Sequence, residues 1–223
     1  MKQTKAHDAA NPHLLSLMPA GCARVLEVGC SSGALAAAYK AQNSHSLYIG
    51  VEIDPTSAEL ARQKCDRVVT GNFETLSDAE FDDLLPADCV VFGDTIEHFR
   101  DPWDVLNRVA SRMRPDDVIC ACIPNAQHWS MQANLATGRF HYADSGLLDR
   151  THLRFFTWIT IQHLFASAGF QITTARTRNV DNTVGERFLP AIRAMAEAAG
   201  VDADDAVRFS LPYQFVVSAK RAD

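Results

Sequence analysis

The sequence predicts one α/β domain built on a mostly parallel β-sheet. Short, continuously apolar runs alternate along the chain with segments that carry helix signals. Strands of a parallel sheet are buried on both faces, and each needs a crossover, usually a helix, to reach its neighbour. The 223 residues, 47% of them hydrophobic and 22% charged, suit a single globular domain. We find no repeat or linker and take residues 1–223 as one domain.

The first half of the chain predicts five strands with helices between them. In chain order, the strands are expected over 24–29, 46–54, 66–72, 88–94 and 117–125, and the helices over 34–42, 55–65 and 101–113. The second of these helices has a clear start, because Asp54 is a favoured N-cap residue and Pro55 suits a first helical turn.

The second half predicts one well-marked helix and two more strands. The helix is expected over 157–169, where Thr157 is a good N-cap and Gly169 a good C-terminal stop. A strand over 170–176, a helical insert over 184–199 and a last strand over 211–220 follow. Residues 1–20 form an N-terminal segment, and 123–157 and 177–210 are expected to wall or cover an acceptor pocket. The insert over 184–210 could instead pack against a second copy in a dimer.

Charge and composition exclude several classes of protein. The formal net charge of −6 gives no general basic field, so a nucleic-acid partner is not expected. No apolar run reaches 18 residues, and the N-terminus lacks the hydrophobic core of a signal peptide. The six cysteines form no C-x-x-C framework. We therefore expect a reduced, cytoplasmic protein without a membrane span.

The stretch VLEVGCSSGAL (25–35) is the most informative in the chain. It ends a predicted strand with the pattern E-x-G-x-S-x-G, which places Glu27, Gly29, Ser31 and Gly33 at the strand-to-helix turn. A dinucleotide-binding turn would have G-x-G-x-x-G and present amides to a pyrophosphate. A carboxylate at this position instead favours a ligand with a cationic end.

A second carboxylate narrows the ligand further. Glu52 lies at the end of the second predicted strand, where α/β nucleotide-binding proteins place an acid that accepts hydrogen bonds from both ribose hydroxyls. A ribose joined to a cationic tail without phosphate describes S-adenosylmethionine. A nicotinamide-dependent oxidoreductase is the competing interpretation, and the absence of G-x-G-x-x-G speaks against it.

Four stretches, taken in chain order, resemble the successive motifs of class I S-adenosylmethionine-dependent methyltransferases. They are VLEVGCSSGALA, YIGVEIDP, GNFETL and VVFGDTIEHFRDPWDVL. The resemblance covers roughly residues 20–176. It implies a Rossmann-like, seven-stranded, mostly parallel sheet whose last strand, over 211–220, is antiparallel. The residues that it implies for the cofactor, from methionine end to adenine, are Glu27, Gly29, Ser31, Gly33, Asp94, Thr95, Glu52, Ile53, Asn72 and Phe73.

Two of these positions depart from a simple cofactor role. Asn72 stands where the family usually has an acid for the adenine amino group, although its amide oxygen is also a hydrogen-bond acceptor. Phe73 is equally well explained as a core residue.

The stretch GDTIEHF (93–99) supports three interpretations. Glu97 and His98 could simply open a helix, whose positive end favours Glu97. His98, or His152 in DRTHLRFFT, could be a general base, because imidazole titrates near neutral pH.

The third interpretation is a divalent metal held by Asp94, Glu97, His98 and His152. The first three have i, i+3, i+4 spacing and would share one face of a helix. The set resembles the E-x-x-E-H motif and later histidine of metal-dependent 2′-O-methyltransferases of small RNA and of quinone-pathway O-methyltransferases, with Asp94 in place of the first glutamate.

Residues 123–157 follow a strand end and are rich in aromatic, histidine and arginine side chains. We expect His128, Trp129, Tyr142 and Arg154 to contact the acceptor. The run GRFHYADSGLLDRTHLRFFT (138–157) is similar to a bacterial methyltransferase subgroup associated with surface-polysaccharide biosynthesis. A sugar or small-molecule hydroxyl is therefore the expected acceptor.

Alternatives to this function also stay open. The acceptor could instead be the nitrogen of a heterocyclic metabolite, and the chain could be a silent subunit that binds the cofactor and serves a partner. A monomer and a homodimer are both compatible with the sequence.

Overall fold

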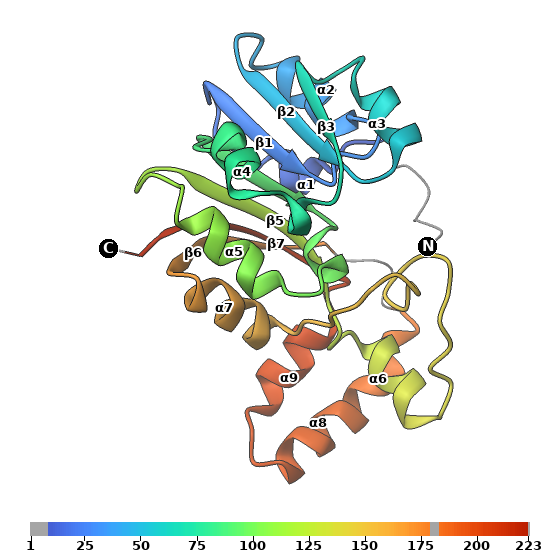
Figure 1. The fold of residues 1–223 in the computed structure, drawn as a ribbon. Coiled ribbons are helices and arrows are strands. Elements are labelled where there is room, and N and C mark those ends of the chain that lie inside the picture. Colours follow the sequence, from blue (N-terminus) through green and yellow to red (C-terminus); the bar gives the residue numbers. More distant parts are fainter. Residues whose placement is uncertain (1–8, 179–182, 223) are drawn as a thin grey trace.

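The computed structural model describes residues 9–178 and 183–222. In this part of the chain seven strands form one sheet, in the order β3–β2–β1–β4–β5–β7–β6 (Figure 1). The strands are β1 (Arg24–Val28), β2 (Leu47–Glu52), β3 (Arg67–Thr70), β4 (Cys89–Gly93), β5 (Val118–Pro124), β6 (Phe170–Arg178) and β7 (Gln214–Arg221). Strand β7 is antiparallel to both neighbours, and the other pairs are parallel. The predicted fold class is confirmed.

Helices cover both faces of the sheet (Figure 1). One apolar cluster joins the sheet to α1 (Pro12–Leu15), α2 (Ala34–Lys40) and α3 (Pro55–Ala61). The larger cluster joins the other face to α4 (Asp78–Leu84), α5 (Pro102–Ala110) and α7 (Trp158–Ser167). Cys89, Cys120 and Cys122 are fully buried strand residues with free thiols, so they serve as small apolar side chains in the core.

A second group of helices lies beyond one end of the sheet. Figure 1 shows α6 (Trp129–Ala136), α8 (Leu189–Ala198) and α9 (Ala203–Ser210) gathered there, away from the layers that cover the sheet. Short 3-10 helices complete the described elements: η1 (Phe73–Thr75), η2 (Ile96–His98) and η3 (Gly185–Phe188).

The predicted helix starts agree with the structure where a capping residue marks them. The Asp54 side chain accepts a hydrogen bond from the Ser57 amide, and Thr157 accepts one from the Thr160 amide. Gly169 follows α7 with φ +77°, a conformation that costs glycine little and ends the helix. Caps therefore fix these boundaries through local hydrogen bonds that the sequence displays.

Other boundaries differ from the prediction. Helix α3 ends at Ala61 rather than near Cys65, and β7 begins at Gln214 rather than Leu211. Pro212 lacks the amide hydrogen that a ladder position would need. Helices α4, α6 and α9 were not predicted, because none combines a strong cap with a long apolar periodicity in the sequence. No helix among the described residues is long and apolar enough to span a membrane.

Candidate active site

The candidate site lies where the strand order reverses, at the carboxyl ends of β1, β2 and β4. Strand β1 pairs with β2 on one side and β4 on the other, so that Val28 lies level with Val51 and Phe92. Ligands of open α/β sheets bind in the crevice at such a switch point. The residues that follow these three strands therefore converge on one place.

The turn after β1 has the conformation that its glycines allow. Gly29 and Gly33 have φ +74°, and Ser31 between them also has positive φ, at +50°. The amides of Gly29 and Cys30 both donate to the Val51 carbonyl oxygen, at 2.8 and 3.2 Å. The loop is thus tied across to β2 before α2 begins.

Glu52 organises this loop from the end of β2. Its Oε2 accepts a hydrogen bond from the Ser31 amide at 2.7 Å, and its Oε1 accepts one from the Asp54 amide at 2.9 Å. A carboxylate offers about four lone-pair sites, so both oxygens keep capacity for the hydroxyls of a ribose. Glu52 is also largely buried, which fixes its orientation.

Glu27 lies deeper than Glu52. Its side chain is 5% exposed, and its Oε2 accepts a hydrogen bond from the Tyr48 hydroxyl at 2.9 Å. Burial raises the pKa of Glu27 well above its ordinary value, and the Tyr48 hydrogen bond opposes that shift. Tyr48 was not among the predicted site residues, because only the register of β1 on β2 brings its ring to Glu27.

The three residues predicted for adenine have different surroundings. Ile53 is exposed beside Glu52 and offers an apolar surface. The Asn72 side-chain oxygen accepts a hydrogen bond from the Glu74 amide at 3.0 Å and so caps η1. Phe73 is 2% exposed and packs against Phe81, with ring centroids 4.6 Å apart. Phe73 is thus a core residue in this structure.

Thr95 and Asp94 connect β4 to the loop after β1. The Thr95 hydroxyl lies 2.9 Å from the carbonyl oxygen of Val28, to which it donates. Asp94 has φ +53°, and its carboxylate accepts hydrogen bonds from the Gln214 amide and the Cys122 thiol. Gln214, at the start of β7, is a neighbour that the sequence did not indicate.

Glu97, His98 and His152 form a compact cluster directly after this connection. The His98 and His152 rings have centroids 4.9 Å apart, and the Nε2 atom of His152 is 3.9 Å from Oε1 of Glu97. Backbone hydrogen bonds hold the two segments together, because the Leu153 and Arg154 amides donate to the Glu97 carbonyl oxygen at 2.8 and 3.0 Å.

The cluster does not include Asp94, which corrects the four-residue set suggested by the sequence. That set assumed a continuous helical turn from Asp94 to His98. The positive φ of Asp94 breaks the turn, and the 3-10 helix η2 begins only at Ile96. Within the described residues, Glu97, His98 and His152 have potential ligand atoms within 4.8 Å of one another.

Two of the predicted acceptor residues belong to the start of α6. His128 is buried and its side chain caps the helix by accepting from the Ser130 amide. The Trp129 ring stacks on Phe188 with centroids 5.4 Å apart and an interplanar angle of 13°. Gly185 lies against the same indole: a Cβ there would be 2.5 Å from Nε1. Residues 123–157 and the later insert are therefore in direct contact.

Aromatic rings continue outward from His152. Phe155 is next to His152 and Phe140 is next to Phe155, each pair with centroids 6.3 Å apart. Tyr142 follows, 6.0 Å from Phe140, and is 57% exposed. Phe140 and Phe155 were missed, because aromatic residues in a connector have no periodicity that marks them.

Arg154 is placed beside this aromatic run by the backbone of a different segment. Its Nε donates to the Arg100 carbonyl oxygen at 3.0 Å, and its guanidinium lies over the Trp103 ring at 5.7 Å. Those contacts hold the Arg154 head group against the start of α5.

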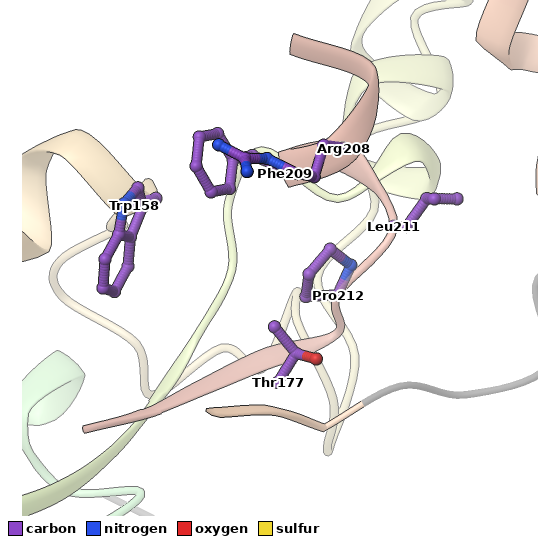
Figure 2. A pocket seen from close by; sticks show the side chains of 6 residues that line it. All are labelled: Trp158, Thr177, Arg208, Phe209, Leu211 and Pro212. Atoms are coloured by element: carbon purple, nitrogen blue, oxygen red, sulfur yellow. The ribbon is translucent and has the colours of Figure 1, made fainter. Parts of the chain in front are cut away.

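A cavity of about 540 Å³ lies outside this region. Figure 2 shows its lining side chains, which come from α7, β6, α9 and the segment before β7: Trp158, Thr177, Arg208, Phe209, Leu211 and Pro212. The Trp158 and Phe209 rings stack with centroids 6.1 Å apart. None of the six residues was predicted for the site.

Comparison with known proteins agrees with the geometry. A family model described as a methyltransferase domain matches residues 5–175. A search of curated proteins finds no match. Similar solved structures include an S-adenosylmethionine-dependent methyltransferase from Thermotoga maritima, with TM-score 0.62, 17% identity, and coverage of 94% of this chain and 86% of that one.

Two other structures are similar at lower identity. Magnesium protoporphyrin IX methyltransferase from Synechocystis PCC 6803, with bound S-adenosylhomocysteine, has TM-score 0.58 and 14% identity. The match covers 92% of this chain and 75% of that one. The O-methyltransferase NcsB1 from neocarzinostatin biosynthesis has TM-score 0.55 and 14% identity. The match covers 94% of this chain but about half, 51%, of NcsB1.

The family match extends over most of the chain, and the fold has the seven-stranded order with an antiparallel β7. The chain therefore belongs to the methyltransferase domain family, and its fold is the Rossmann-like fold of the methyltransferase structures that it resembles.

Proposed function

We propose that this protein transfers the methyl group of S-adenosylmethionine to a hydroxyl of a sugar or another small molecule. The observation that carries this proposal is the position of the Glu97–His98–His152 cluster. It follows Thr95, which is hydrogen-bonded to the end of β1, and so lies next to the loop that we assign to the cofactor. A proton-accepting group beside a methyl donor suits an oxygen acceptor, which must lose a proton.

On this proposal the cofactor is held from three strand ends. Glu27, with Gly29, Ser31 and Gly33, receives the methionine end, and Glu52 accepts hydrogen bonds from the ribose hydroxyls. Asp94 and Thr95 lie under the methionine portion. Ile53 and Asn72 flank the adenine, whereas Phe73 supports this wall from the core.

The transfer itself is a direct displacement. The acceptor oxygen attacks the sulfonium methyl carbon, the carbon–sulfur bond breaks, and its electron pair stays on sulfur, which leaves as S-adenosylhomocysteine. The hydroxyl proton passes to Nε2 of His98 or His152. The donor is already activated, so the protein contributes mostly by aligning the two reactants and excluding water.

The acceptor is proposed to bind along the aromatic run that leads from His152 through Phe155 and Phe140 to Tyr142. Such faces pack against the apolar face of a sugar or against an aryl ring. Arg154, whose guanidinium lies over Trp103, directly precedes Phe155 in the chain, and Trp129, stacked on Phe188, is proposed as a further wall of the acceptor pocket. His128 acts indirectly, because it is buried and fixes the start of α6.

The test combines ligand binding with a product assay on the full chain. Thermal-shift measurements with S-adenosylmethionine, S-adenosylhomocysteine and NAD(P) identify the cofactor. Stabilisation by NAD(P) alone would refute S-adenosylmethionine as the methyl donor. Labelled S-adenosylmethionine is then offered with monosaccharides, nucleotide sugars, phenols and heterocyclic amines. O-methylated product supports the proposal. Product formed only on nitrogen refutes the hydroxyl acceptor, and cofactor binding without any product favours a binding subunit.

A further inference from the structure

Glu97 has an unusual environment for a carboxylate. It is 1% exposed, and neither Oε1 nor Oε2 has a hydrogen-bond partner among the described residues. An ionised carboxylate in such surroundings is unfavourable unless a cation or hydrogen-bond donors pair with it. A group that carries positive charge, or a proton, must compensate this carboxylate in the working protein.

The two imidazoles beside Glu97 are oriented by backbone carbonyls. Nδ1 of His98 is 3.1 Å from the Thr151 carbonyl oxygen, and Nδ1 of His152 is 3.3 Å from that of Leu147. A carbonyl oxygen only accepts hydrogen bonds, so each Nδ1 carries the hydrogen. In the neutral ring Nε2 then presents a lone pair. Metal-binding histidines are commonly fixed in this way by a carbonyl on the other ring nitrogen.

The donor atoms are close enough to share one ion. The ligand atoms of Glu97, His98 and His152 lie within 4.8 Å of one another. Donors at tetrahedral angles, each about 2.1 Å from an ion, would be about 3.4 Å apart. Side-chain rotations that shorten the donor separations by about 1–1.5 Å therefore close the set around an ion. Backbone contacts already hold the His152 segment on Glu97, so the ligands are gathered before any ion binds.

We propose that Glu97, His98 and His152 bind one divalent transition-metal ion, with affinity for Zn²⁺, Co²⁺ or Mn²⁺ above that for Mg²⁺. Two nitrogen donors and one oxygen suit these ions, whereas Mg²⁺ prefers an all-oxygen octahedron. Asp94, which would have made the set richer in oxygen, is instead hydrogen-bonded to Gln214 and Cys122. Three protein ligands leave coordination positions open.

The role of the ion rests on the proposed function. A bound divalent ion lowers the pKa of a hydroxyl that coordinates it, so an acceptor oxygen at an open position would attack more readily. Glu97, His98 and His152 then act as ligands that position the ion beside the methyl donor. With the ion bound, the Nε2 lone pairs of His98 and His152 are occupied, so the ion replaces them in activating the acceptor and the hydroxyl proton passes to water. Binding of the ion itself does not depend on methyl transfer and can be measured alone.

The experiment is a titration of the metal-free full-length protein with Co²⁺, Zn²⁺, Mn²⁺ and Mg²⁺. Calorimetry and the visible absorption of Co²⁺ are the readouts, and S-adenosylhomocysteine binding is measured on the same samples. We expect one equivalent of Co²⁺ or Zn²⁺ to bind, at least tenfold more tightly than Mg²⁺. Glu97→Gln, His98→Ala and His152→Ala should each weaken binding by at least about tenfold.

The control leaves the cluster intact. His163→Ala removes an exposed histidine of α7, outside both the cluster and the cofactor loop. This variant should keep wild-type metal affinity. The proposal is overturned if the wild-type protein binds no transition ion, if the three cluster variants bind as wild type does, or if Mg²⁺ is preferred. S-adenosylhomocysteine binding in the same samples shows that the variants are folded, and its presence without metal binding leaves the proposed methyl transfer standing.

Discussion

The Thr95 side chain occupies the space that a Cβ atom would need at Gly29. An added Cβ would lie 2.5 Å from Thr95 Oγ1, and the backbone at Gly29 has φ +74°. Thr95 cannot easily retreat, because its hydroxyl is hydrogen-bonded to the carbonyl oxygens of Val28 and Gly93 at 2.9 and 3.1 Å. The close approach of the β1 and β4 ends thus depends on this glycine.

Gly29→Ala should therefore destabilise the protein and abolish cofactor binding. Backbone strain and overpacking together are expected to cost about 2–5 kcal/mol. Gly21→Ala is the matched control, because Gly21 has the same φ of +74° but no atom within 4 Å of its added Cβ. It should cost about 1–2 kcal/mol and leave S-adenosylhomocysteine affinity unchanged. Denaturant unfolding and calorimetry measure both; equal effects of the two substitutions would contradict the role of Thr95.

Glu27→Gln should reveal how the raised pKa of Glu27 affects stability. An acid whose pKa is higher in the folded than in the unfolded state binds its proton more tightly when folded. The stability that the protonated Glu27 contributes to the fold is fully present below the ordinary carboxyl pKa. It is lost as pH rises through the raised pKa of the folded state. The wild-type protein should thus lose unfolding free energy relative to Glu27→Gln as pH rises above the ordinary carboxyl pKa.

The same measurement tests the proposed contact with the methionine ammonium. A cation beside Glu27 stabilises the carboxylate, so saturating S-adenosylhomocysteine should weaken the pH dependence of the wild-type protein. A difference between wild type and Glu27→Gln that does not change with pH would mean that Glu27 keeps an ordinary pKa.

Glu52→Gln should weaken cofactor binding more than it weakens the fold. The substitution puts an amide where Oε1 and Oε2 accept from the Asp54 and Ser31 amides and where the ribose is proposed to bind. Loss of a charged hydrogen bond costs about 1.5–3 kcal/mol, or roughly 10- to 150-fold in affinity. Asp54→Asn is the control, since Asn caps α3 about as well as Asp. Calorimetric titration with S-adenosylhomocysteine gives both affinities, and unchanged binding by Glu52→Gln would exclude the ribose contact.

Sequence patterns were sufficient for the features that depend on neighbouring residues. The apolar strands, the Asp54 and Thr157 caps and the glycine turn after β1 are all local, and the structure contains each of them. Features that depend on distant segments could not be predicted. Sequence spacing suggested that Asp94 joins Glu97, but Asp94 is turned away by its own positive φ and bound by Gln214, 120 residues later.

The cluster and the acceptor wall show the same limit. His152 was named as a partner of His98 only by resemblance, because their contact requires the Leu153 and Arg154 amides to bond to Glu97. The sequence alone allows Phe73 to be either a core residue or an adenine contact. Only the three-dimensional packing of its ring against Phe81 shows that it is buried.

Gly185→Ala should impair use of the acceptor without affecting the cofactor. A Cβ at Gly185 would lie 2.5 Å from Nε1 of Trp129 and would push the indole off its stack with Phe188. If that stack shapes the acceptor pocket, kcat/KM for the acceptor should fall about tenfold, which corresponds to about 1.4 kcal/mol of transition-state stabilisation. Affinity for S-adenosylhomocysteine should stay at the wild-type value.

Gly200→Ala separates this effect from a general loss of stability in the same group of helices. Gly200 has φ +69° just after α8, and its added Cβ would have no atom within 4 Å. The substitution should cost about 1–2 kcal/mol of unfolding free energy through backbone strain, yet keep kcat/KM unchanged. Steady-state kinetics with the acceptor found in the product assay compares the two variants. A similar fall in kcat/KM in both variants would show that the stability of helices α6, α8 and α9, rather than the Trp129–Phe188 stack, governs acceptor use.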